Sequence, residues 1–157
     1  MKPKVYVETT IISYLTARLS RDLIVAGHQQ VTHEWWQAPR HDLNVVSSQL
    51  VVREASVGDP EAAQERLALL RELTLLEITE EALTLAQHLL RTGAIAEGFP
   101  EDALHVAVAV VNGVEYLLTW NYRHLANAAM RSKIEEACRE AGYEPVVICT
   151  PEELMEV

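Results

Sequence analysis

The sequence predicts an α/β fold: a central, mostly parallel sheet of about five strands flanked by helices. Two observations support this prediction. Short apolar segments alternate along the chain with longer amphipathic ones. Residues that start or stop helices stand at the boundaries between them. No linker, repeat or low-complexity stretch interrupts this pattern, so the 157 residues are expected to form a single domain spanning positions 1–157.

Five segments have the length and apolar character of buried strands. They are residues 4–8, 43–47, 73–78, 115–119 and 144–149. Helices between consecutive strands return the chain to the same edge of the sheet, which makes the strands parallel. In such sheets the ligand site lies beyond the carboxyl ends of the strands. Functional residues are therefore sought at those ends.

Helices are predicted between the strands from capping residues and apolar spacing. Ser20, one of Ser47 and Ser48, Asp59 and Thr79 stand where a helix N-cap is expected. The predicted helices lie around residues 11–15, 21–38, 49–55, 60–70, 80–90, 100–112, 123–127 and 130–141. The helix that begins at Pro100 is apolar nearly all round after Asp102, which predicts deep burial.

Composition limits the classes of function. The formal net charge of −10 argues against broad non-specific binding of nucleic acid, which depends on basic surface. It also suits a basic protein partner, although most acidic proteins have no such partner. No apolar run approaches the roughly 20 residues that span a bilayer, and nothing suggests export, so we expect a cytoplasmic protein. The two cysteines and six histidines form no zinc-binding pattern.

Four polar residues are candidates for a metal site. Glu8 ends the first strand, Glu54 lies late in the helix after the second, Asp102 opens the apolar helix, and Asn121 follows the fourth strand. A doubly wound sheet can bring these positions together at one edge. Clustered carboxylates repel one another unless a cation is bound. Because all the ligands are oxygens, Mg²⁺ or Mn²⁺ is favoured over zinc.

Each candidate also has a plainer explanation. Asp102 is an acid in the first turn of a helix, where the helix dipole favours it. Glu54 alone is an ordinary solvated helix residue, and Asn121 alone is a turn residue. Glu8 is harder to explain in this way, because strands disfavour Glu and a buried acid needs a partner. The hypothesis therefore rests on the joint placement of the four.

Three segments resemble those of PIN domains. VYVETTIISY at 5–14 is similar to the opening strand that ends in an acid followed by Ser or Thr. SSQLVVREA at 47–55 resembles the segment that carries the second acid. EDALHVAVAVVNGVEYLLTWNYRHLAN at 101–127 is similar to the third-acid helix and the polar turn that follows it. The resemblance extends from residue 4 to about 150 and is strongest to VapC-type toxins of bacterial toxin–antitoxin pairs.

The resemblance implies a role for each matched residue. Glu8, Glu54 and Asp102 match the first, second and third metal-binding acids, and Asn121 matches the fourth polar position. The implied activity is hydrolysis of RNA phosphodiester bonds with Mg²⁺ or Mn²⁺. The ion would polarise the phosphate and lower the pKa of an attacking water.

The chain departs from the family pattern at its first acid. Glu8 stands where the family usually has Asp, so the carboxylate lies one methylene farther from the backbone. This matters because Mg²⁺ demands near-ideal octahedral geometry. Thr9 and Thr119 match positions where polar neighbours of the site are common and are candidates for substrate contact.

Substrate contact also requires local basic groups. Arg18 and Arg21 follow the first strand and Arg123 follows the fourth, so they are candidates for binding phosphates; the alternative is scattered surface arginines. His105 lies one turn after Asp102 and is expected to be a core histidine with its hydrogen bonds satisfied. His124 is a weak candidate for phosphate contact.

The resemblance further implies partners: a small antitoxin protein, and a second copy of the chain in a homodimer. Trp35 and Trp36 are adjacent at the end of a predicted helix. They cannot easily point the same way, so one is expected in the core. The other either lies on a partner surface or packs beneath a neighbouring loop.

Three functions are therefore weighed. The first is a metal-dependent endoribonuclease, the toxin of such a pair. The second is a non-catalytic PIN fold with a weakened metal site that binds RNA or protein, which the Glu8 departure and the acidic charge motivate. The third is a different Mg²⁺-dependent phosphotransfer enzyme. It is disfavoured because the first strand ends in Glu8 and two threonines rather than in a nucleophilic Asp.

Overall fold

The structure is a computed structural model and describes residues 2–155. Its centre is a five-stranded sheet in which all neighbouring strands are parallel, in the order β3-β2-β1-β4-β5. The strands are β1 (Lys4–Val7), β2 (Asn44–Ser48), β3 (Thr74–Leu76), β4 (Tyr116–Leu118) and β5 (Val147–Cys149). The predicted α/β class is confirmed, although each strand except β2 is shorter than expected.

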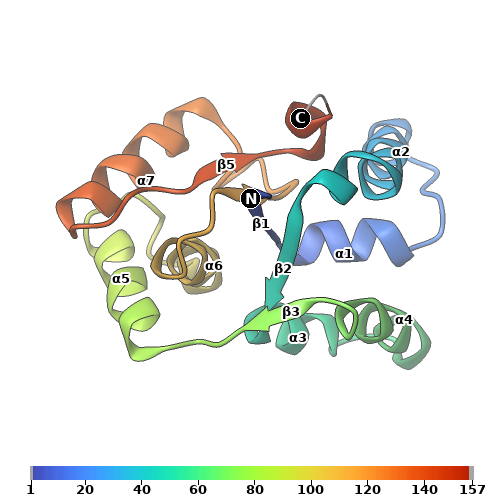
Figure 1. Cartoon of the computed structure of the whole chain (residues 1–157), viewed down its shortest axis with the longest axis horizontal. Coiled ribbons are helices and arrows are strands. Elements are labelled where there is room, and N and C mark those ends of the chain that lie inside the picture. Colours follow the sequence, from blue (N-terminus) through green and yellow to red (C-terminus); the bar gives the residue numbers. More distant parts are fainter. Residues whose placement is uncertain (1, 156–157) are drawn as a thin grey trace.

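The helices cover the sheet in two groups. Figure 1 shows α1 to α4 on one side of the sheet and α5 to α7 on the other. The helices are α1 (Thr9–Thr16), α2 (Leu23–Gln37), α3 (Gln49–Ala55), α4 (Pro60–Leu70), α5 (Glu80–Arg91), α6 (Pro100–Val111) and α7 (Ala128–Glu140), with short 3₁₀ helices η1 (Pro39–Asp42) and η2 (Pro151–Leu154). No helix between residues 2 and 155 is long and apolar enough to cross a membrane.

The strand register aligns the segments that follow the strands. Val7 is paired with Leu118 across β1 and β4, and the amide of Glu8 donates to the carbonyl of Leu118 at 3.1 Å. The amide of Thr119 in turn donates to the carbonyl of Cys149 at 3.0 Å. Since the strands are parallel, their carboxyl ends form one edge, and Glu8 and Thr119 are neighbours there.

Several predicted caps are confirmed. Asp59 Oδ2 accepts from the amide of Ala62 at 3.0 Å, and Thr79 Oγ1 accepts from that of Ala82 at 3.2 Å. Ser48, rather than Ser47, caps α3 by accepting from the amide of Val51 at 3.2 Å. These side chains satisfy backbone donors that a helix start leaves without partners.

Two helix predictions were wrong. The second helix begins at Leu23, because Asp22 accepts from two amides of the first turn and Ser20 does not. Residues 123–127 form turns rather than a helix. Asn127 stabilises these turns, because its side-chain nitrogen donates to the carbonyls of Tyr122 and Arg123. Its side-chain oxygen caps α7. Asn side chains compete with helix in this way.

The core contains α6, as its all-round apolar character predicted. Ala103 and the run Val106–Val110 are buried. Trp35 is fully buried, whereas Trp36 is half-buried with the guanidinium of Arg40 at 4.2 Å from its ring centroid. One tryptophan is thus in the core as expected, and the other packs against η1. Both cysteines are buried free thiols, and burial raises the pKa of Cys138 to about 11.

Candidate active site

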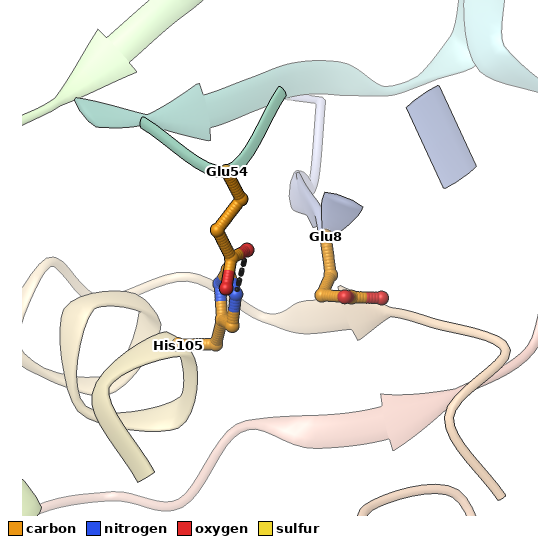
Figure 2. Close-up of side chains that lie close together, drawn as sticks. All are labelled: Glu8, Glu54 and His105. Carbon is orange, nitrogen blue, oxygen red and sulfur yellow. Dashed lines mark hydrogen bonds and ion pairs between the residues drawn. The ribbon is translucent and has the colours of Figure 1, made fainter. Parts of the chain in front are cut away.

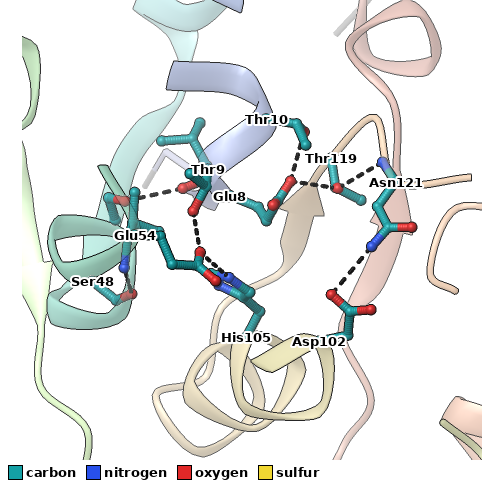
Figure 3. Close-up of polar contacts among 12 residues, drawn as sticks. Glu8, Thr9, Thr10, Ser48, Glu54, Asp102, His105, Thr119 and Asn121 are labelled. Carbon is teal, nitrogen blue, oxygen red and sulfur yellow. Dashed lines mark hydrogen bonds and ion pairs between the residues drawn. The ribbon is translucent and has the colours of Figure 1, made fainter. Parts of the chain in front are cut away.

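The candidate site lies where β1 and β4 end, with contributions from the last turn of α3 and the first turns of α6. Glu8 is the residue between β1 and α1, Glu54 is in α3, and Asp102 and His105 are in α6. Figure 3 shows these side chains converging from their separate elements on one region. Sequence positions nearly a hundred residues apart therefore share one edge of the sheet.

Glu8 is held in place through one of its two oxygens. Its side chain is 6% exposed, and Oε1 accepts hydrogen bonds from the hydroxyls of Thr10 and Thr119, each at 2.6 Å. Thr10 is fixed in turn by the amide of Trp120, which donates to its oxygen at 2.9 Å. Within residues 2–155, Oε2 of Glu8 has no hydrogen-bond partner. The carboxylate is thus anchored with one oxygen left available.

Glu54 lies near Glu8 and is also anchored through one oxygen. Oε1 accepts from the hydroxyl of Thr9 and from Nε2 of His105, the latter at 2.8 Å. Burial disfavours the charged form of Glu54, but His105 and Thr9 outweigh that effect and lower its pKa. One ligand atom from each of Glu8, Glu54 and His105 falls within 4.8 Å of the other two (Figure 2).

His105 is buried, as expected, but its partners were not foreseen. It is 1% exposed and hydrogen-bonded at both ring nitrogens, to Glu54 through Nε2 and to the Tyr6 hydroxyl through Nδ1 at 2.7 Å. Burial by itself would lower the pKa of His105, but the hydrogen bond to Glu54 and the surrounding carboxylates raise it. Tyr6 also contacts Ser48 Oγ at 2.7 Å, and burial raises the pKa of its hydroxyl.

Asp102 lies on the other flank, joined to Glu8 through two intervening residues. Its Oδ1 accepts from the side-chain amide of Asn121 at 3.2 Å, and the backbone amide of Asn121 donates to Thr119 Oγ1 at 3.0 Å. Its Oδ2 contacts His124 Nδ1 at 2.9 Å. Asp102 is not part of the three-residue cluster around Glu54. Figure 3 shows Thr119 and Asn121 between the two acids.

The three acids have no arginine or lysine as an ion-pair partner anywhere in the described chain; the ion pairs of Glu54 and Asp102 are with His105 and His124. Arg18 and Arg21 lie exposed in the α1–α2 loop and Arg123 lies exposed in the β4–α7 turn.

The donor set therefore fits a hard divalent cation. It consists of carboxylate oxygens with hydroxyl and amide neighbours, together with the ring nitrogen of His105 that lies beside Glu54. Such a cation would remove the repulsion between Glu8, Glu54 and Asp102.

Sequence reasoning missed Tyr6, Thr10 and Phe99. Tyr6 precedes Glu8 by two residues, so the two-residue period of a strand places both on the same face, a signal that was present but not used. Thr10 is near Glu8 only because α1 turns immediately after β1. Phe99 is 41% exposed and its ring centroid lies 3.8 Å from that of His124, a contact between distant segments that no spacing indicates.

Comparison with known proteins identifies a solved structure with a similar fold. No family model matches the sequence, and neither does any curated protein. A chain of the crystal structure of VapBC2 from Rickettsia felis bound to a DNA fragment from its promoter is similar in structure, with a TM-score of 0.59 and 14% sequence identity. The match covers 94% of this chain and 98% of that chain. The expected fold is confirmed: the chain has a PIN-like fold.

Proposed function

We propose that this protein is a Mg²⁺- or Mn²⁺-dependent endoribonuclease that hydrolyses phosphodiester bonds in RNA. The observation that carries the proposal is the convergence of Glu8, Glu54 and Asp102 at the carboxyl edge of the sheet, where no lysine or arginine among residues 2–155 is paired to them. Carboxylates that lie close together repel one another, and a divalent cation offsets that repulsion. The similarity to a chain of VapBC2 also supports the proposal, through the fold alone.

In this proposal Glu8 and Asp102 hold the ion directly, and Glu54 does so directly or through water. Glu8 and Glu54 are suited to this because each is anchored through Oε1 and leaves Oε2 for another ligand. A bound ion would polarise the phosphate and lower the pKa of an attacking water. Asn121 positions Asp102 and lies within reach of the same region.

Other residues are assigned to the substrate. Thr9 and Thr119 fix the two glutamates by donating to them, and their place at the site makes them candidates for contact with the RNA backbone. Arg18 and Arg123 are exposed on segments that follow α1 and β4, and we assign them to phosphate binding. With a net charge of −10, RNA must be attracted by the bound ion and by these few arginines.

We further propose that the protein is the toxin of a toxin–antitoxin pair. The similarity in fold to a chain of the VapBC2 structure supports an antitoxin partner, and the acidic charge of this chain suits a basic one. We also propose that the protein forms a homodimer. A short basic protein encoded beside this one would be the partner to co-express.

The test is cleavage of a panel of structured RNAs by purified protein in Mn²⁺. Asp102→Asn keeps the shape of the side chain but removes its charge, and we expect it to lower the cleavage rate at least ~100-fold. Glu144→Gln, which makes the same charge change just before β5 at the opposite edge, should cleave as the wild type does. Equal cleavage by Asp102→Asn and wild type would show that the site assignment is wrong.

The alternative is a PIN-like fold without catalysis that binds RNA or protein. The glutamate at position 8 is the observation that favours it, because the longer side chain changes the reach of the first acid. A protein that binds Mn²⁺ and RNA but cleaves no member of the panel would support this alternative over the nuclease.

A further inference from the structure

Three buried side chains form a hydrogen-bonded network that ends at the partly exposed Glu54. The Ser48 hydroxyl lies 2.7 Å from the Tyr6 hydroxyl, which lies 2.7 Å from His105 Nδ1, and His105 Nε2 lies 2.8 Å from Glu54 Oε1. Ser48 and Tyr6 are each 0% exposed and His105 is 1% exposed. The Tyr6 and His105 rings pack edge to face with centroids 5.8 Å apart, which restricts rotation of the imidazole. The part of the network from Ser48 to His105 is therefore shielded from solvent.

The donor and acceptor of each hydrogen bond can be assigned from the two ends of the network, the Ser48 hydroxyl and the Glu54 carboxylate. Ser48 Oγ already accepts the amide proton of Val51 as the cap of α3, so its own proton can be donated to Tyr6. Tyr6 then donates its proton to Nδ1 of His105. This leaves the imidazole proton on Nε2, facing a carboxylate oxygen that can only accept. Each hydroxyl and each ring nitrogen of the network then has a hydrogen-bond partner without charging the histidine.

A proton on Nε2 has a consequence for the metal site. A ring nitrogen that carries a proton has no lone pair to offer a cation. Although His105 Nε2 lies in the same cluster as the oxygens of Glu8 and Glu54, it would then be excluded from the coordination shell. The ligands left are carboxylate oxygens, a set that suits Mg²⁺ or Mn²⁺ and not zinc.

We propose that His105, oriented by Tyr6 and Ser48, is a positioning residue that donates from Nε2 to Glu54 and is not itself a metal ligand. It fixes one oxygen of Glu54 so that the other is presented to the ion. Residues that orient ligands in this manner commonly change metal affinity about 10- to 100-fold when removed. The part of the proposal that concerns the ion rests on the proposed function, whereas the hydrogen bond itself does not.

The first test needs no metal. Long-range ¹H–¹⁵N NMR spectra of the metal-free protein, with the His105 signals assigned by their loss in His105→Gln, report which ring nitrogen carries the proton. We expect Nε2 to be protonated. A proton on Nδ1 alone, with a bare Nε2, would overturn the proposal because that nitrogen would be free to bind a cation.

The second test uses Mn²⁺ as the probe. Electron spin echo spectroscopy of the wild-type protein with bound Mn²⁺ detects directly coordinated ¹⁴N. We expect no nitrogen coupling of that kind, and its presence would overturn the proposal. If the wild type binds no Mn²⁺ while Nε2 is protonated, the proposed function fails but the assigned hydrogen bond is supported. The two failures are therefore distinguishable.

Substitutions separate positioning from mere packing. His105→Gln retains a side-chain N–H donor and should keep the Mn²⁺ affinity within about threefold, whereas His105→Leu should weaken it about 10- to 100-fold. If His105 acts through Glu54, His105→Leu should cost no further affinity in a protein that already carries Glu54→Ala. Losses that multiply in the double variant would show that His105 contributes independently, which would overturn the proposal.

Discussion

The site provides hydrogen-bond partners for the long side chain of Glu8. Its carboxylate lies one methylene farther from the backbone than an aspartate would, and two hydroxyls meet it there. Thr10 and Thr119 both donate to Oε1, at 2.6 Å each. The residue stands at the N-cap of α1, yet its side chain makes no capping hydrogen bond and turns to these threonines instead. The longer side chain therefore has its own anchoring partners.

A pH dependence follows from the pair of Glu54 and His105. The folded-state pKa of Glu54 is lowered, so its stabilisation is present above its unfolded pKa of ~4.3 and is lost as the pH falls through the folded pKa. The folded-state pKa of His105 is raised, so its stabilisation is present below ~6.5 and is lost as the pH rises through the folded pKa.

Urea unfolding across pH measures both effects. Glu54→Gln should flatten the pH dependence of the unfolding free energy at both its acid and its near-neutral end relative to the wild type. Glu144→Gln, exposed and distant from this pair, is the control and should leave the profile unchanged. Identical profiles for wild type and Glu54→Gln would show that the pair does not couple to folding.

At the scale of elements, helix ends bring the acids together. Asp102 and His105 are three residues apart in α6, so they project from the same face near its amino end. There the helix dipole also favours the charge of Asp102. Ser48 closes β2 and opens α3, and it bonds to Tyr6 of β1 as well as to the amide of Val51. One hydroxyl thus serves a helix cap and a contact between strands.

This double role makes the two capping sites unequal. Asp59→Ala at the exposed start of α4 removes one cap and should lower the unfolding free energy by ~1 kcal/mol. Ser48→Ala removes a cap and also leaves the buried Tyr6 hydroxyl without one partner, so it should cost more, on the order of 2–3 kcal/mol. Urea unfolding of the two variants checks this order, and an equal loss would contradict it.

At the scale of the whole molecule, the parallel sheet determines where charge gathers. The chain carries a formal net charge of −10, and three of its acids lie at the carboxyl edge of the sheet. Like charges at that edge repel one another, and a bound cation would remove this repulsion. Metal binding should therefore stabilise the folded protein.

Thermal unfolding with and without Mn²⁺ tests this coupling. Mn²⁺ at 100 times its dissociation constant should stabilise the wild type by about 2.7 kcal/mol and raise its Tm accordingly. Glu8→Ala should abolish the rise, whereas Glu144→Ala, which removes the same charge at the amino end of β5, should preserve it. A rise that persists in Glu8→Ala would mean that the ion binds elsewhere.

The sequence alone determined the α/β class, the five strands, three of the four predicted helix caps and the likeness to PIN domains. These depend on local preferences and on periodicity, which act over a few residues. It erred at residues 123–127 and at the start of α2, where polar side chains compete with helix by bonding to the backbone. Such competition depends on fine differences between neighbouring residues.

Only the tertiary structure decided which side chains meet. The order and register of strands far apart in the chain bring Thr10 and Thr119 to Glu8. They also place His105 between Tyr6 and Glu54. Spacing could place Glu8 and Asp102 at one edge, but it could not tell that Thr119 and Asn121 lie between them. Contacts of this kind are set by the packing of the whole molecule, because no local pattern encodes them.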